Sequence, residues 1–296
     1  MILARPLYLW LLRAAWVTLP LTAGPAASAA IGGWSDGPRI AAATLLWLAW
    51  AAGLLATLAP RPETLTALRI IAPTFFLLAI AAAIDGSAST IALVGALVAT
   101  AVCSVLASGH DIASAAANAF AYGDEQRFPL RTPPALFFGP LPIARVLVAA
   151  SVAAPVLFLA DGDIVAGIVT LVIGAALVFV LGRSLSGLSR RWAVLVPAGF
   201  VVVDTLTLAD PVLFLRERIR SIHAADPGAA PDDVMDLRLG AGLGSVAIVF
   251  DQTAEIVRAT RARRGGETVR TDEIRIAVIR RDEVLGLAAG RRLPVR

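Results

Sequence analysis

Six long apolar runs dominate the first two thirds of the chain, and short polar segments separate them. An α-helix needs about 20 mostly apolar residues to cross a hydrocarbon core about 30 Å thick. Each run meets that length, so the pattern predicts six membrane-spanning helices. We expect them at residues 7–31, 39–59, 65–84, 88–108, 141–160 and 163–183.

After Arg190 and Arg191 the long runs give way to short apolar stretches bounded by turn residues. This pattern is typical of strands. We expect about seven strands and a closing helix at 282–292, which predicts a bundle of about six spans followed by a small, mainly β, α+β domain. The strand ranges are 192–196, 200–204, 211–215 leading into 216–222, 236–239, 245–250, 255–261 and 269–279.

Composition supports this division of the chain. Apolar residues make up 58%, against roughly 45–50% in soluble domains. Residues 1–184 hold only 9 of the 26 basic and 8 of the 22 acidic residues. We therefore expect a transmembrane domain at 1–184 and a cytoplasmic domain at 185–296.

Arginine provides every basic residue, which together with abundant alanine and glycine is typical of a GC-rich bacterial genome. Arginines collect on alternate connections, and the positive-inside rule then places both termini in the cytoplasm, in a multi-pass protein of the cell inner membrane. The arginines on that side are Arg5, Arg61, Arg69, Arg127, Arg131, Arg145, Arg183, Arg190 and Arg191. A cleaved signal peptide ending near 26–30 is the alternative for the first span, and it would leave five spans in the same orientation.

The scarcity of metal-binding residues limits the possible chemistry. One cysteine, Cys103, and two histidines exclude a disulfide framework and a structural zinc site. The net charge of +4 lacks the clustered excess that nucleic-acid binding requires. We therefore expect no metal, no cofactor and no nucleic-acid partner.

The connection at 109–140 carries a candidate polar site at the cytoplasmic surface: His110, Asp111, Asp124 and Glu125. A histidine beside an aspartate can move protons, and adjacent carboxylates can bind a cation. The alternative is that Asp111 caps the following helix while the other charges are solvated. Apolar residues farther along are expected to lie in the membrane interface: Phe128, Leu136, Phe137 and Phe138.

The C-terminal pattern resembles the bacterial pleckstrin-homology-like (PH-like) domain of small membrane proteins. The resemblance covers about 190–292, and the segments RWAVLVPAGFVVVD (191–204) and IRSI (219–222) carry it. It implies a membrane-proximal docking domain that binds a peptide or a lipid headgroup, and no enzymatic activity.

Two further motifs in this domain have specific alternatives. The segment GAGLG (240–244) is similar to a phosphate-binding loop, but a strand pattern follows it, so a tight turn is the better interpretation. The segment RATRARRG (258–265) is similar to the Ala-Arg-Gly coupling element of energy-coupling-factor transporters, where it lies on a helix. Here the pattern predicts a hairpin.

Two arginine clusters are candidate sites for anionic lipid or a protein partner: Arg216, Arg218 and Arg220, and Arg261, Arg263 and Arg264. The alternative is an ordinary solvated strand face. Three functions follow as hypotheses: a non-enzymatic membrane scaffold that docks a protein or lipid, a transporter or permease subunit, and a membrane-embedded enzyme that uses 109–127. The near absence of ionisable residues within the spans argues against an ion-coupled transporter.

Overall fold

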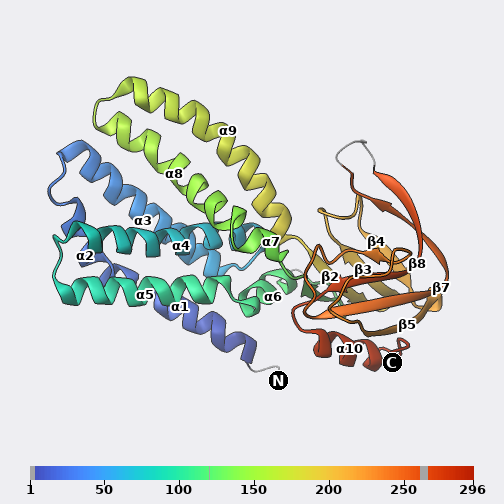
Figure 1. Cartoon of the computed structure of the whole chain (residues 1–296). Coiled ribbons are helices and arrows are strands. Elements are labelled where there is room, and N and C mark those ends of the chain that lie inside the picture. The colour runs from blue at the N-terminus through green and yellow to red at the C-terminus, as the bar shows by residue number, and fades with distance from the viewer. Residues whose placement is uncertain (1–3, 120, 261–265) are drawn as a thin grey trace. The chain divides into compact units, whose positions relative to one another are not determined.

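The computed structural model describes residues 4–119, 121–260 and 266–296, and the chain divides into two compact units. The first unit comprises Met1–Ala116 and Leu141–Ser186, and the second comprises Ala117–Pro140 and Gly187–Arg296. Figure 1 shows helices in the first unit and mainly strands in the second. The sequence predicts a single boundary near Ser184, whereas the chain passes between the two units three times, because 117–140 belongs with the C-terminal unit.

Among the described residues, six helical segments are long and apolar enough to cross a membrane, which confirms the predicted number of long apolar helical runs. These candidate spans, called spans below, are Leu7–Ile31, Asp36–Leu58, Pro62–Asp85, Thr90–Ser108, Pro140–Ala160 and Ile164–Ser189. The first consists of α1 (Ala4–Thr22) and α2 (Gly24–Ile31), and the others are α3, α4, α5, α8 and α9 in chain order. The break between α1 and α2 lies between Pro20 and Pro25. The helix is interrupted there because each proline lacks the N–H that a continuous helix requires.

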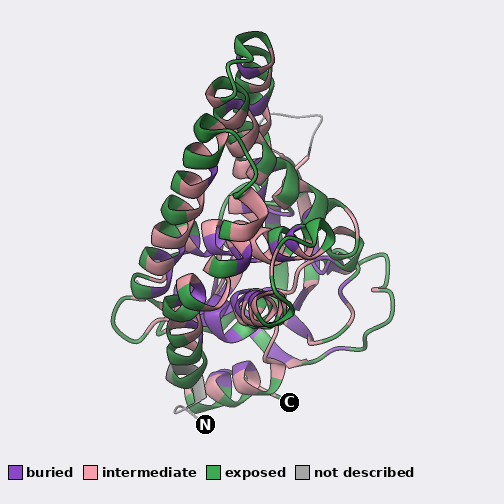
Figure 2. Ribbon diagram, turned by 90° about the vertical axis from the view of Figure 1, so that its left-hand side faces the viewer, coloured by how far each residue is buried: buried purple, intermediate pink, exposed green. Residues whose placement is uncertain are grey.

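The inner surface of the first unit is built from residues of α1, α3, α4, α5 and the short helix α6 (His110–Asn118). Trp16 is fully buried there and stacks on Phe75 with ring centroids 5.8 Å apart. A smaller cluster joins Ala26, Ala79 and Ala96, whose small side chains allow α2, α4 and α5 to approach closely. Figure 2 shows that much of the long helices is exposed. In the most apolar stretch of each span, only 11–22% of residues are buried.

The second unit, called the β domain below, contains two four-stranded sheets in its described residues. The first has the order β1-β2-β3-β4 and is antiparallel throughout, and the second has the order β5-β7-β8-β6. The first-sheet strands are β1 (Gln126–Pro129), β2 (Trp192–Val196), β3 (Gly199–Val203) and β4 (Val212–Leu215). The second-sheet strands are β5 (Ile219–Ala224), β6 (Met235–Asp236), β7 (Ser245–Arg258) and β8 (Glu267–Ala277).

One continuous strand, β7, replaces the two that we expected at 245–250 and 255–261. The pairing of β7 with β8 shifts in register between Val249 and Ala254. The strand continues through this shift, but the period-two pattern of the sequence is interrupted there, and for that reason the pattern predicts two strands. The closing helix is α10 (Arg281–Gly290), close to the expected range. Its Val284 and Ala288 complete an apolar core to which both sheets contribute.

Phe128 belongs to this core and is only 5% exposed, so its expected position in the membrane interface is wrong. It lies on β1, whose backbone pairs with Ala193 of β2, and the pairing directs its side chain into the β domain. Phe137 and Phe138, in contrast, are exposed and pack edge to face at the end of α7 (Pro134–Phe137).

Candidate functional site

The segment 117–140, called the insert below, provides the edge strand of the first sheet. The side chain of Asn118 forms hydrogen bonds with both backbone polar groups of Arg127. Its Nδ2 donates to the carbonyl of Arg127 and its Oδ1 accepts from the N–H of Arg127, each at 2.8 Å. This arrangement resembles a strand-to-strand pair and covers the outer edge of β1 at Arg127. An edge that is covered in this way is protected from pairing with another chain.

The Arg127 side chain extends the same contact. It forms an ion pair with Glu125 and lies over the Trp192 ring at 5.4 Å from the centroid. The insert thus contacts β2 through its backbone, a cation–π interaction and apolar packing.

A buried ion pair anchors the end of the insert. Arg191 donates to both carboxylate oxygens of Asp204 at 2.7 and 2.8 Å, and its third nitrogen donates to the carbonyl of Arg131 at 3.0 Å. Both charged side chains are almost completely buried. The N–H of Arg131 in turn donates to Ala277 of β8, so the insert joins the first sheet to the second.

Two of the three arginines in the predicted basic cluster at 216–220 contact other residues of the β domain. Arg216 donates to the carbonyl of Pro197 at 2.7 Å, and Arg220 pairs with Asp251 at 3.1 Å. For Arg218 no ion pair is found with the described residues. The other cluster, Arg261, Arg263 and Arg264, lies outside the described residues.

The structure assigns the four residues of the candidate polar site to different units. His110 and Asp111 are in the first unit, with 3.4 Å between the histidine Nε2 and the carboxylate, and Asp111 is buried. Asp124 and Glu125 are in the second, where Glu125 already pairs with Arg127. Among the described residues, no group of three histidines, cysteines and acids is placed to hold a metal.

Arg238 and Asp236 form the other strongly bonded pair of the β domain. Arg238 is buried, and it also donates to Ser245 and to the carbonyls of Asp226 and Gly228. Burial alone raises the pKa of Asp236, but hydrogen bonds from Arg238 and the charges of Arg238 and Arg275 lower that pKa overall. These contacts hold the 226–245 loops, so we interpret the pair as structural.

The glycine-rich segment is a turn, as predicted, and it leads into β7 rather than a helix. Gly240 and Gly244 have positive φ angles of 83° and 72°, and a side chain at Gly244 would meet the carbonyl of Val278 at 2.1 Å. In the segment similar to a coupling element, Arg258 ends β7 and pairs with Glu267 of β8. Its described part is therefore not helical.

Arginines cap helix C-termini in the bundle. The Nε of Arg13 donates to the carbonyl of Thr57 at the end of α3 at 3.0 Å, and its guanidinium lies 4.8 Å from the Trp10 ring centroid. The Nε of Arg69 donates to the carbonyl of Ala107 at the end of α5 at 3.4 Å. The last carbonyls of a helix lack intrahelical donors and carry partial negative charge, so both contacts are favourable.

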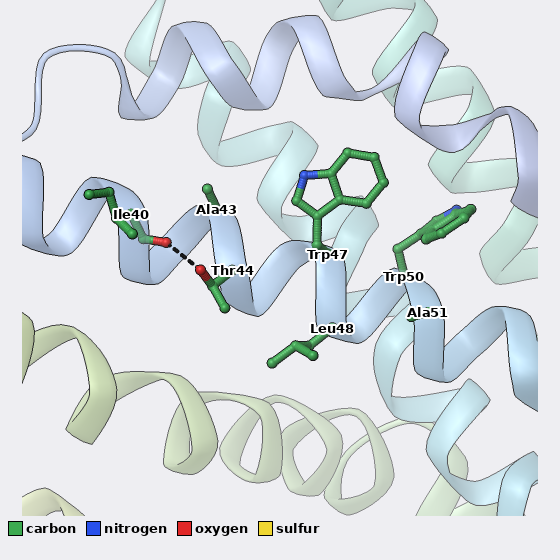
Figure 3. Close-up of a pocket in the computed structure, with 7 residues that line it drawn as sticks. All are labelled: Ile40, Ala43, Thr44, Trp47, Leu48, Trp50 and Ala51. Carbon is green, nitrogen blue, oxygen red and sulfur yellow. Dashed lines mark hydrogen bonds between the residues drawn. The ribbon is translucent and has the colours of Figure 1, made fainter.

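A shallow apolar groove of about 530 Å³ runs along α3 (Figure 3). The Oγ1 of Thr44 donates to the carbonyl of Ile40 at 2.8 Å, so this hydroxyl is satisfied within its own helix. The lining suits an alkyl chain and offers no acid–base chemistry. It consists of Ile40, Ala43, Thr44, Trp47, Leu48, Trp50 and Ala51.

Comparison of the chain with protein-family models, curated proteins and solved structures finds no significant match. The case for a function therefore rests on the residues themselves. The role of Asn118 at the edge of β1 could not be predicted from the sequence, since a lone asparagine at a helix end gives no signal of a strand partner nine residues later.

Proposed function

We propose that this chain is an integral protein of the bacterial inner membrane whose cytoplasmic β domain docks a protein partner. The membrane assignment is supported by six apolar helices whose outer surfaces are mostly uncovered. Uncovered apolar helix faces of this extent are unfavourable in water and favourable in lipid. The arginine-rich connections support the orientation with both termini in the cytoplasm.

The observation that carries the scaffold proposal is the insertion of β1 into the first sheet. The domain is built from a segment between two spans and a segment after the last span, so three chain passages tie it to the bundle. A single connection would restrict the motion of such a domain less than three connections do. The triple attachment suits a module that presents a docking surface close to the membrane.

A protein partner is preferred over lipid on this domain for two reasons. The charge of Arg220 is offset by Asp251, and Arg216 uses one of its donors on the carbonyl of Pro197, so fewer free donors and less net charge are available for headgroups. Apolar side chains are exposed on it as well, with Leu213 on β4 48% and Leu243 71% exposed. Two sheets followed by a C-terminal helix support the PH-like interpretation, in which docking surfaces of this kind are expected.

Photo-crosslinking in the native bacterium tests the proposal. A photoreactive amino acid at Leu213 or Leu243 of the full chain should give one defined adduct with a cytoplasmic protein. The matched control is the buried Val202, which should give none. Adducts with lipid alone, or none from any exposed position, would overturn the protein-docking proposal.

The break between α1 and α2 favours one second candidate, a transporter subunit, because interrupted helices often line substrate sites. Against it, Trp50 donates to the carbonyl of Trp16 that Pro20 leaves without a helical donor. The carbonyl of Trp16 is therefore bonded to a side chain of the same bundle and does not face a substrate path. Uptake of a substrate into vesicles that depends on the full chain would favour the transporter.

A further inference from the structure

The edges of the two sheets differ in how they are covered. The edge strands of the described β domain are β1 and β4 in the first sheet and β5 and β6 in the second. Asn118 covers β1 at Arg127. The C-terminal residues run beside β5, where the N–H of Ile222 donates to the carbonyl of Pro294 at 2.7 Å. The edge at β6 is only two residues long, Met235–Asp236. The remaining edge is that of β4.

The backbone of β4 is open on the side away from β3. In an antiparallel sheet, alternate residues of a strand direct both backbone groups to the same neighbour. The N–H of Arg216 donates to the carbonyl of Ala198 at 3.0 Å, so Phe214, two residues earlier, also bonds toward β3. Leu213 and Leu215 therefore direct their N–H and C=O groups to the open edge. Among the described residues, no hydrogen-bond partner is found for these groups.

The side chains of β4 are apolar on both faces of the sheet. Phe214 belongs to the core, whereas Leu213, on the opposite face, is 48% exposed. Native edge strands are commonly protected from pairing by a charged residue or a covering segment. Among the described residues, β4 (Val212–Leu215) has neither, so it is suited to pair with one more strand.

The charges at the two ends of β4 differ in sign. The exposed Asp210 precedes the strand, and the 3-10 helix η1 (Arg216–Arg218) follows it with two arginines and Glu217. For Asp210 and Arg218 no ion pair is found with the described residues. When two identical strands lie antiparallel, the acidic end of each is beside the basic end of the other. The edge of β4 is therefore complementary to itself, as a two-fold symmetric contact requires.

We propose that β4 pairs with β4 of a second copy of this chain, so that the two first sheets form one continuous antiparallel sheet. Leu213 of each copy lies opposite Leu215 of the other, because these residues carry the open backbone groups. Each such pair exchanges both backbone hydrogen bonds. Asp210 of each copy then lies near η1 of the other.

The pairing goes beyond the docking function proposed above and is compatible with it. Strands pair along the edge of a sheet, and the side chain of Leu213 stays on its outer face, where a cytoplasmic protein can still contact it. A contact of four residues per copy is weak. Confinement to one membrane, which rests on the proposed function, raises the local concentration of copies and favours the pairing.

Disulfide cross-linking in native membranes tests the register. Hydrogen-bonded antiparallel pairs have Cα atoms about 5.5 Å apart, a distance that a disulfide can bridge. Full chains with Leu213→Cys and with Leu215→Cys, both in a Cys103→Ala variant and expressed together, should form a mixed dimer on oxidation. Each variant alone should form several-fold less, because identical residues lie about 7–8 Å apart on the diagonal. Leu243→Cys, at an exposed position outside β4, gives the level of random collision.

A proline substitution tests the backbone pairing. Leu215 has a φ of −66°, which proline adopts without strain, so Leu215→Pro removes the open N–H and preserves the strand. The dimer fraction of labelled full-length protein diluted in liposomes, counted by single-molecule photobleaching, measures the effect. Dissociation should become about thirtyfold more favourable, because each copy loses one donor. The control Leu215→Ala keeps the N–H and should have a much smaller effect.

A charge exchange tests the ends of the strand without a change in the backbone. Asp210→Arg should weaken the dimer about tenfold, because both symmetric contacts become repulsive. Addition of Arg218→Asp to the same chain restores opposite charges and should recover most of the loss. The liposome measurement is the same.

Four outcomes would overturn the proposal. One is a dimer that Leu215→Pro leaves unchanged while tryptophan fluorescence shows a folded protein. Another is equal cross-linking by the mixed and the single cysteine variants. A third is failure of Arg218→Asp to rescue Asp210→Arg, which decides the matter even if the proline variant does not fold. The fourth is a cross-link from Leu213→Cys to a different protein only, which would assign the edge to that protein. Photo-crosslinking at Leu243 tests the cytoplasmic partner independently of all four.

Discussion

The indole groups of Trp16 and Trp50 each donate a hydrogen bond to the backbone carbonyl of the other, both at 2.9 Å. Trp16 lies on α1 and Trp50 on α3, so the pair joins two spans. Pro20 is four residues after Trp16 and has no N–H, which leaves the Trp16 carbonyl without its usual helical donor. Trp50 provides the missing donor, and the chain tolerates a proline inside an apolar span.

Trp50→Phe should destabilise the bundle by about 1 kcal/mol, because it removes this donor while it keeps an aromatic ring. Unfolding of the purified protein in mixed micelles measures the change. In a Pro20→Ala background the carbonyl regains a helical donor, so the same substitution should cost less. An equal cost in both backgrounds would contradict the link to Pro20. Trp47→Phe, on the exposed side of α3, is the control.

Gly53→Ala should destabilise the bundle by about 1–3 kcal/mol through overpacking. An added Cβ would lie 1.9 Å from Cζ2 of Trp16, whose ring is buried and stacked on Phe75. Gly182→Ala serves as the control because its Cβ would meet no atom within 4 Å. The same unfolding measurement applies, and equal stabilities of the two variants would show that Trp16 can move aside.

Asn118→Ala should weaken the attachment of β1 by about 1–3 kcal/mol, because it leaves both the N–H and the carbonyl of Arg127 without this partner. Asn118→Asp keeps an acceptor for the N–H and should cost less. Amide hydrogen exchange across Gln126–Pro129 of the full chain measures the effect. Unchanged protection in the alanine variant would mean that pairing with β2 alone holds the strand.

Stability of the β domain should fall as the pH drops below about 4. The pKa of Asp236 in the folded state is lower than its unfolded value of about 3.9, so its contribution is present above that value and is lost as the pH falls through the folded pKa. Asp236→Asn should flatten this part of the profile, measured by denaturant unfolding from pH 6 to 3. A variant with the wild-type pH profile would assign the acid sensitivity to other carboxylates.

Single cysteines introduced into a Cys103→Ala variant test the proposed orientation of the chain in the membrane. Ser87→Cys should react with a membrane-impermeant maleimide on intact spheroplasts, because it lies in the connection between α4 and α5 that we place outside. Tyr122→Cys should react only after lysis, since Tyr122 is 90% exposed and belongs to the β domain. Reversed labelling would contradict the positive-inside assignment.

The spans could be predicted because each is a long apolar run, a signal that needs no tertiary context. The strand β1 could not, because its four residues, Gln126–Pro129, are too few for a period-two pattern and end in a proline. Its pairing with Trp192–Val196 joins segments more than sixty residues apart. Phe128 consequently looked like an interfacial residue, although the pairing places it in a core.

The arginine clusters illustrate the same limit for the candidate site. Arg216, Arg218 and Arg220 lie within five residues of one another in the sequence and suggest one basic surface. The carboxylate that pairs with Arg220 is Asp251, thirty-one residues away on β7. Charge along a chain therefore overestimates the charge that a folded surface presents.

The split origin of the first sheet sets an order for biosynthesis. The ribosome makes Gln126–Pro129 before α8 and α9, and its partner β2 only after both. During that interval β1 lacks its partner strand, and in the proposed membrane topology the translocon handles two further hydrophobic segments. Completion of the sheet in that topology follows insertion of the helical hairpin formed by α8 and α9. A protein whose hairpin failed to insert would carry an unfinished sheet, a defect that quality-control proteases recognise as exposed, unpaired chain.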